Sequence, residues 1–393
     1  MIRTLGRKYN QLKIRNALKR NRAKKPSRET ILPKGRRFLC LLLSSIGDAI
    51  MAQPAWTMLK ASIPDAAIDL VCWPNLSGLF SGDSAVRNIL PFENLKGRLW
   101  HNSDVRRLEN IWKNTQYDFV IDFAQIPLTS VACSLQSCPY SVGRQKTAER
   151  PDQGMNLSIA YDLPVLYAES DPIRDVMVQL VKPWVSTRVK RPNPTLYVNK
   201  DKKEAMIRWL REKGISSGEK FVVLAPGAKW QPKCWPSKYW GDLLNLINQR
   251  LRTPPIVLGG PEDKKTLSAI MQPIKAPSPS FFLSEDLALS TVLIQQAALC
   301  VCSDSAAMHI AAAVGTPSVA LFGPVSPSKS APSEDEGCHV LYEGLFCSPC
   351  TLYYSRERCR RGLNFCMYAL APERIYSEIE KLIGFARSAN EST

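Results

Sequence analysis

Long apolar runs are scarce in this chain. The best candidate for an export or membrane signal is Phe38–Leu43, a run of six residues that is soon followed by Asp48. A membrane-spanning helix needs about 20 apolar residues, and no A-x-A-type cleavage site follows the run. We therefore interpret it as a buried strand, and we expect a cytoplasmic protein without a spanning helix.

Glycine is also infrequent, and proline is not abundant enough to mark a fibrous or low-complexity chain. The 393 residues include 20 Gly and 29 Pro, which excludes a collagen-like protein. An apolar content of 45% excludes a mostly disordered one. The length favours two or three domains with buried cores.

Acidic residues are almost missing from the first 37 positions. This segment holds 14 Lys and Arg residues and one acid, whereas the remaining chain is nearly balanced, with 38 basic and 34 acidic residues. Ile2, Leu5, Tyr9 and Leu12 are spaced as on one face of a helix. This pattern favours an amphipathic helix on an anionic membrane surface. A nucleic-acid-binding arm and a solvated tail remain alternatives, although a single tyrosine offers little base stacking.

Apolar runs alternate with helix-length segments in two series, and we expect each run to form a short buried strand. The first series is Phe38–Leu43, Ala67–Cys72 and Phe119–Asp122; the second is Phe221–Ala225, Ile256–Leu258, Leu299–Cys302 and Ser318–Phe322. This rhythm predicts α/β domains with parallel sheets covered on both faces. Two such domains facing each other would bind ligands in a cleft at the carboxyl ends of their strands.

Residues 181–196 interrupt the rhythm with three prolines, which indicates a connection between domains. We therefore predict a basic arm over 1–35, an N-terminal Rossmann-like domain over 36–182 and a linker over 183–196. A C-terminal Rossmann-like domain over 197–371 and a final helix and tail over 372–393 complete the organisation.

The first loop with chemical potential follows the first predicted strand, and it contains Ser45, Gly47 and Asp48. Gly47 permits a tight turn, and Asp48 stands where a helix starts. Pro54 indicates a helix that begins near Gln53 or is kinked. A carboxylate in this place can accept a proton from a substrate, or it can cap the helix. The dinucleotide-binding pattern G-x-G-x-x-G is missing.

The second loop is LAPGAKWQPKCWP, residues 224–236. Lys229 and Lys233 follow a small-residue turn, so both can approach a phosphate, with backbone amides near Gly227 as further donors. The alternative is a solvated lysine pair beside packed tryptophans. A Walker A loop is excluded because G-K-[ST] is absent.

The third loop, CSDSAAMHIAAAVGTP, has the pattern strand, loop, short helix and strand. Asp304 or Ser305 caps the helix, and Gly315 suits its left-handed end. The free amides of the first turn offer an anion site. His309 is either a packed core residue or a partner of Asp304 in a functional site.

Four cysteines near the C-terminus follow the pattern Cys347-x2-Cys350-x8-Cys359-x6-Cys366. Paired cysteines in a cytoplasmic chain suggest structural zinc, which takes four thiolates in tetrahedral geometry. An iron–sulfur cluster and free thiols remain alternatives, because the last spacing is long for a zinc knuckle.

Taken together, these segments resemble glycosyltransferase family 9, the lipopolysaccharide heptosyltransferases. The similarity is carried by GDAIMAQPAWTMLKASIPDAAIDLVC, VVLAPGAKWQPKCWP, GGPEDKK, SDSAAMHIAAAVGTPSVALFGPVSP and the closing cysteine stretch, in family order from about Phe38 to Ile383. The resemblance implies a GT-B fold and a metal-independent, inverting enzyme that needs no cofactor. It implies ADP-heptose as donor, the inner core of a lipid A-linked acceptor as the other substrate, and a peripheral location on the inner face of the cytoplasmic membrane.

The resemblance also assigns roles to residues. Asp48 matches the general base, in an acceptor loop with Ser45 and Gly47, and Lys233 matches the lysine at the donor diphosphate. Asp304 matches the aspartate at the donor sugar, and His309 matches a donor-binding histidine.

The remaining donor contacts are implied in the same way. The amides of Ser305, Ala306 and Ala307 match those that face the diphosphate. Asp263, or its neighbour Glu262, matches the acid on the adenosine side.

The chain departs from the family pattern at three positions. Ala306 replaces a glycine, and Lys229 and Trp230 replace small hydroxylated residues. A GT-B transferase with another nucleotide sugar and an inactive nucleotide-sugar-binding protein at the membrane therefore remain alternatives.

Overall fold

The computed structural model describes residues 35–93, 102–135, 137–146, 161–168, 170–251, 253–274, 279–350, 359 and 361–390. The predicted basic arm lies outside the described residues, apart from residue 35. Contacts divide the chain into unit 1, Met1–Pro194, and unit 2, Thr195–Thr393.

Unit 1 is a six-stranded parallel sheet with helices between its strands. In chain order its elements are β1 Arg37–Leu42, α3 Ile46–Ser62, β2 Ala67–Cys72, α4 Pro74–Phe80, β3 Asn88–Pro91, α5 Asn102–Asn114, β4 Phe119–Asp122, α6 Pro127–Cys133, β5 Tyr140–Lys146, β6 Leu163–Tyr167 and α7 Ile173–Gln179.

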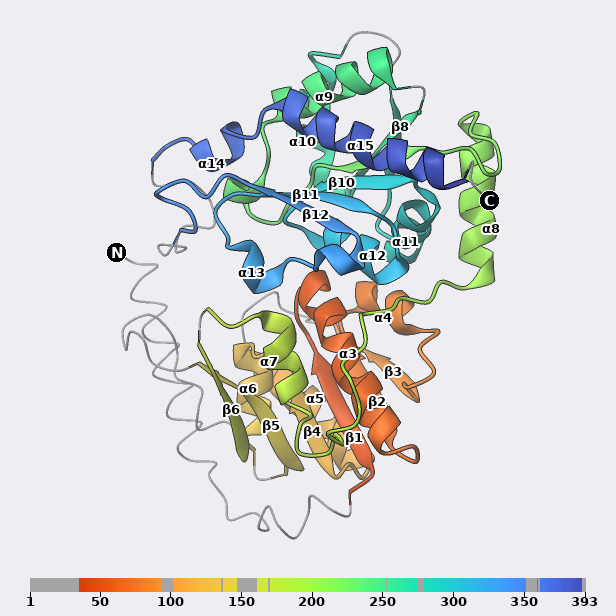
Figure 1. The fold of residues 1–393 in the computed structure, drawn as a ribbon. Helices are drawn as coiled ribbons and strands as arrows, with labels where there is room; N and C mark the ends of the chain where they lie inside the picture. The colour runs from red at the N-terminus through yellow and green to blue at the C-terminus, as the bar shows by residue number, and fades with distance from the viewer. Residues whose placement is uncertain are drawn as a thin grey trace. The chain divides into compact units, whose positions relative to one another are not determined.

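The strand order of unit 1 is β3-β2-β1-β4-β5-β6, and all its pairs are parallel. The chain builds outward from β1 to β3 and then returns to the other side of β1 with β4. The switch point, where open α/β sheets bind ligands, therefore lies between the carboxyl ends of β1 and β4. Alternate residues of the central strands, including Leu39, Leu41 and Val120, pack against α5 and α6. Figure 1 shows α3 running along the sheet, with α7 packed beside it.

Unit 2 repeats the same architecture. Its elements are α8 Lys200–Glu212, β7 Val222–Ala225, a 3-10 turn Gln231–Lys233, α9 Ser237–Arg250, β8 Pro255–Gly259, a 3-10 turn Pro261–Asp263, α10 Lys264–Met271, β9 Ser280–Leu283, α11 Leu287–Gln296, β10 Leu299–Ser303, α12 Ala306–Val314, β11 Ser318–Phe322, α13 Pro327–Ser330, a 3-10 turn Glu334–Glu336, β12 Cys338–Tyr342, α14 Phe365–Tyr368 and α15 Pro372–Asn390.

The sheet of unit 2 has the order β12-β11-β10-β7-β8-β9, so its switch point lies between β7 and β10. Alternate strand residues such as Val222, Leu224, Val301 and Leu321 join a core with Trp240 and other residues of α9, α10 and α15. Figure 1 shows these three helices on one face of the sheet and α11 and α12 on the other.

The predicted fold class, two Rossmann-like α/β domains, is confirmed by the two sheets. Each of the seven predicted strands is present within two residues of its expected ends, and β3, β5, β6, β9 and β12 are additional. The alternative in which the first helix begins near Gln53 is wrong: the helix begins at Ile46 and contains Pro54, because Ser45 already caps it there. Among the described residues, no helix is both long and apolar enough to cross a membrane.

Candidate active site

In unit 1, Asp48 lies in the first turn of α3, directly after β1. Ser45 is the N-cap, and its Oγ accepts a hydrogen bond from the Asp48 amide (3.3 Å) and donates one to Asp48 Oδ2 (2.8 Å). Asp48 is therefore the third helical residue and not the cap. Gly47 is the second helical residue and not part of a tight turn. The Asp48 side chain is half-buried and held in place by Ser45, at the edge where the switch point of unit 1 opens.

In unit 2, two predicted residues meet although they are far apart in the sequence. Lys233 follows β7 and Asp304 follows β10, the two strands that flank the switch point. The Lys233 Nζ lies 2.7 Å from Asp304 Oδ2, and the two side chains are 17% and 7% exposed. This largely buried ion pair places one cation at the ligand-binding edge of the sheet.

The backbone around Lys233 is fixed from several sides. Lys233 ends a 3-10 turn in which its amide donates to the carbonyl of Trp230 (2.9 Å), and its Nζ lies 4.8 Å from the centre of the Trp230 indole. The buried side chain of Asn364 donates to the carbonyls of Pro232 (3.2 Å) and Cys234 (3.0 Å), on either side of the lysine. Sequence reasoning missed Asn364, because no local pattern links it to a loop some 130 positions earlier.

The loop after β10 ends in the N-terminus of α12. Ser305 is the N-cap, without a side-chain capping bond, and Ala306 is the first helical residue. A positive φ, which would favour glycine, does not occur at Ala306. His309 is 5% exposed within the helix, one turn from its start. The first-turn amides of α12 therefore lie beside Asp304 with no side-chain cap over them.

Asp263 closes the loop after β8. Its Oδ2 accepts a hydrogen bond from the Gly260 amide (2.8 Å). A Cβ placed on Gly227 would lie 2.8 Å from the same oxygen, so the carboxylate sits directly on the turn after β7. Because β8 neighbours β7, Asp263 belongs to the same edge as Lys233, whereas Glu262 makes no hydrogen bond to a described residue.

The four C-terminal cysteines differ from the expected zinc site, whereas the donor-binding role of Lys229 stays a prediction. Lys229 is exposed and makes no ion pair with a described carboxylate. All four C-terminal cysteines are described, and no group of three or more His, Cys, Asp or Glu residues in the described chain is placed to hold a metal. The expected structural zinc is therefore not supported, and the Cys350 thiol donates a hydrogen bond to the carbonyl of Cys347 (3.3 Å).

The segment that carries these cysteines instead braces the site. Ser348 Oγ donates to the carbonyl of Gly323, and the Cys350 amide donates to the carbonyl of Pro324 (2.9 Å), both in the loop after β11. With Asn364, this segment therefore supports two of the loops at the carboxyl edge of the sheet.

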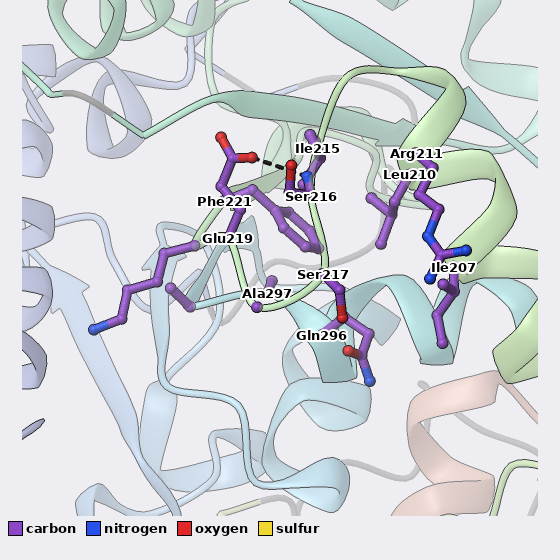
Figure 2. Close-up of a pocket in the computed structure, with 13 residues that line it drawn as sticks. Ile207, Leu210, Arg211, Ile215, Ser216, Ser217, Glu219, Phe221, Gln296 and Ala297 are labelled. Atoms are coloured by element: carbon purple, nitrogen blue, oxygen red, sulfur yellow. Dashed lines mark hydrogen bonds between the residues drawn. The ribbon is translucent and has the colours of Figure 1, made fainter.

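A pocket of about 380 Å³ in unit 2 lies at the amino ends of the strands, opposite the edge that carries Lys233 and Asp304. Figure 2 shows its lining residues, which come from the end of α8, the turn before β7 and the residues before β10, with Glu219 accepting from the Ser216 amide (2.9 Å). Because it opens at the amino ends of β7 and β10, this pocket is separate from Lys233 and Asp304.

The comparisons with known proteins agree with this arrangement. The family model of glycosyltransferase family 9 (heptosyltransferase) matches residues 105–360. The chain is 24% identical over 364 residues to lipopolysaccharide heptosyltransferase 1 of Pseudomonas aeruginosa, which covers 88% of this chain and 98% of that protein.

Solved structures show the same fold. The structure of Escherichia coli ADP-heptose lps heptosyltransferase II matches with a TM-score of 0.70 and 21% identity, over 89% of this chain and 99% of that one. An E. coli heptosyltransferase with ADP-2-deoxy-2-fluoro heptose matches with a TM-score of 0.60 and 15% identity, over 88% and 99%. The fold is thus that of GT-B heptosyltransferases, and, as the family model spans well over half of the residues, this chain belongs to glycosyltransferase family 9, the heptosyltransferases.

Proposed function

We propose that the protein is an inverting glycosyltransferase that moves a heptose from ADP-heptose to the inner core of lipopolysaccharide. The names of its relatives support this activity, and one related structure holds an analogue of ADP-heptose. The observation that carries the proposal is the Lys233–Asp304 pair, which brackets the switch point of unit 2 beside the N-terminus of α12.

This arrangement suits a sugar diphosphate. The Lys233 ammonium neutralises charge on the diphosphate as the bond to the sugar breaks, and the amides of Ser305, Ala306 and Ala307 add hydrogen bonds at the positive end of the helix. Asp304, partly released from Lys233, accepts hydrogen bonds from hydroxyl groups of the donor sugar. Asp263 lies on the adenosine side, while His309 and the exposed Lys229 complete the donor contacts.

Unit 1 supplies the base. The acceptor hydroxyl attacks the anomeric carbon of the heptose, the bond from that carbon to the diphosphate oxygen breaks, and ADP leaves with the electron pair. Asp48 takes the hydroxyl proton. Ser45 donates to Asp48 Oδ2, and Oδ1 accepts no hydrogen bond from a described residue, which leaves it available for the proton.

Two measurements test these roles. Calorimetry with ADP, UDP and GDP identifies the nucleotide, and mass spectrometry of a heptose-free lipid A-linked core detects transfer from ADP-heptose. We expect ADP to bind best and the core to gain one heptose. Tighter binding of UDP or GDP would point to another donor, and a core without added mass would refute heptosyl transfer.

Variants then separate the two steps. Asp48→Asn should lose turnover and keep its affinity for ADP, with Asp65→Asn, an exposed carboxylate, as matched control. Lys233→Ala should weaken ADP binding at least tenfold, and Lys238→Ala on the surface of α9 should not. Because Lys233→Ala leaves the buried Asp304 without a counter-charge, Lys233→Arg serves as the charge-conserving comparison. Normal turnover by Asp48→Asn would exclude it as the base.

We further propose that residues 1–35 hold the enzyme on the anionic inner face of the cytoplasmic membrane, where its lipid-linked acceptor lies. Each basic residue near such a surface contributes about 1 kcal/mol. Deleting 1–35 should reduce binding to vesicles with anionic lipid and transfer to the lipid-linked acceptor, while transfer to a soluble core fragment persists. Equal vesicle binding by both forms would refute this role.

A further inference from the structure

The turn after β4 in unit 1 has an unusual backbone. Gln125 has φ of 51°, and it is the one non-glycine residue of the described chain with a positive φ. The buried Asp122 holds this turn, because its Oδ1 accepts from the amides of Ala124 (2.9 Å) and Gln125 (3.0 Å). Left-handed backbone at a residue with a Cβ costs free energy and persists where its surroundings enforce it, often at functional sites.

The Gln125 side chain ties the turn to the two neighbouring strands. Its Nε2 donates to the backbone carbonyl of Arg144 on β5 (2.7 Å), and its Oε1 accepts from the hydroxyl of Tyr167 at the end of β6 (3.2 Å). Both ends of the amide are therefore occupied within the protein. Gln125 acts as a positioning residue that fixes β5 at Arg144.

Arg144 is a half-buried cation with no counter-charge among the residues that the structure describes. Its Nη2 donates a hydrogen bond to the carbonyl of Phe123 (2.9 Å), and its guanidinium carbon lies 6.0 Å from the centre of the Tyr167 ring. The Nε is buried without an acceptor, and no described carboxylate pairs with the group. A buried guanidinium nitrogen normally has an acceptor, so within the described part of the chain this arginine has a donor that an anionic ligand can use.

The position of Arg144 agrees with a role in ligand binding. Asp122, the last residue of β4, pairs with Gly143, so Arg144 stands one residue beyond the end of β4. Its strand is the second from β1, which leads to Asp48. Two strand spacings are about 10 Å, so a single acceptor oligosaccharide can reach both residues along the ligand-binding edge of this sheet.

We propose that Arg144, positioned by Gln125 and Tyr167, binds an anionic group of the acceptor, a carboxylate or a phosphate. The planar guanidinium matches both groups through paired hydrogen bonds. The inference rests on the proposed function, since it takes the sugar acceptor to occupy the edge that carries Asp48. In this proposal Arg144 selects acidic acceptors, whereas Asp48 removes the proton of the acceptor hydroxyl.

The test measures binding and transfer separately. Calorimetry gives the affinity of the full-length protein for a soluble acidic core oligosaccharide in three forms: intact, with its carboxylates reduced to alcohols, and dephosphorylated. Arg144→Gln should weaken binding of the intact form by about 10- to 100-fold. It should make no difference to the form that has lost the recognised group, which identifies that group. Arg144→Lys, which keeps the charge, should fall between.

Controls exclude a merely structural effect. Arg191→Gln removes another partly exposed arginine of unit 1, the partner of Asp175, and should bind all three oligosaccharides as the parent does. In transfer assays Arg144→Gln should raise the KM for the intact acceptor and leave kcat and ADP affinity unchanged.

Two outcomes would overturn the inference: unchanged affinity of Arg144→Gln for the intact acceptor, or an equal loss with all three forms. A failure of the proposed function has a different signature. In that case no heptose is transferred even though acceptor binding depends on Arg144.

Discussion

Replacing Asn364 by alanine tests whether the C-terminal segment controls the donor site. The change removes the two hydrogen bonds of Nδ2 to the carbonyls of Pro232 and Cys234, and the site is 6% exposed, so little water can replace them. A buried polar group left without its partner costs about 1–3 kcal/mol. We therefore expect the free energy of unfolding to fall by about 2–4 kcal/mol.

The more informative effect is on nucleotide binding. Lys233 lies between these two carbonyls. Without Asn364, its backbone and side chain must become ordered when the diphosphate binds. Ordering a long side chain costs about 0.5–1.5 kcal/mol, and fixing one backbone residue costs about 1–2 kcal/mol. These terms together predict that calorimetry will show an affinity for ADP about tenfold or more below that of the parent, with acceptor affinity unchanged.

Thr316→Val is the matched control, because it removes one buried hydrogen bond, to the carbonyl of Ile294 (2.8 Å), at the other end of α12 from the site. It should lower stability in a denaturant titration and retain full ADP affinity. If Asn364→Ala is destabilised but binds ADP as tightly as the parent does, Asn364 has a structural role alone and the reasoning is wrong.

Three further predictions concern residues packed near the carboxyl ends of the strands, each within one unit. Gly227→Ala places a Cβ 2.8 Å from a carboxylate oxygen of Asp263; calorimetry should show weaker binding of ADP with binding of pyrophosphate retained, because that carboxylate is assigned to the adenosine side. Gly143→Ala places a Cβ 2.3 Å from the ring of Tyr161; overpacking of this kind should lower the free energy of unfolding by about 1–3 kcal/mol in denaturant titrations. Burial raises the pKa of Asp122 above its value in the unfolded chain, which is about 3.9. As pH rises from about 4, the folded protein therefore holds a proton that the unfolded chain has lost, and the free energy of unfolding should fall. Asp122→Asn lacks this group and should show a shallower fall between pH 4 and 7.

Each of these outcomes has a clear opposite. Gly384→Ala on α15 meets no atom within 4 Å and should leave both stability and ADP binding intact, so a comparable loss there would discredit the steric argument for the other glycines. Equal pH slopes for the parent and Asp122→Asn would show that this carboxyl does not titrate differently on folding.

The sequence by itself determined the strands that are buried on both faces. Phe38–Leu43 and Leu299–Cys302 are continuous apolar runs, and central strands of a parallel sheet need that composition wherever they occur. The edge strand Asn88–Pro91 has exposed ends and no such run, and β5 carries Arg144, Gln145 and Lys146, so neither stands out from the sequence.

The start of α3 is hard to predict from the sequence, because a proline and a capping serine indicate different positions. Pro54 suggested a helix that begins late or is kinked, because proline lacks an amide donor. The side chain of Ser45 outweighed this signal by capping the helix nine residues earlier, and burial of the proline against the core offsets the missing bond.

The sequence predicted part of the candidate site, and the fold determined the rest. Its loops were recognisable because glycine, charged residues and helix caps follow apolar runs at short range. Which residues meet was decided by strand order alone: β10 returns beside β7, and this brings Asp304 to Lys233 across 70 intervening residues. Asn364 and Arg144 owe their surroundings to backbone carbonyls from distant segments. Such partners carry no side-chain signature, so only the folded chain could reveal them.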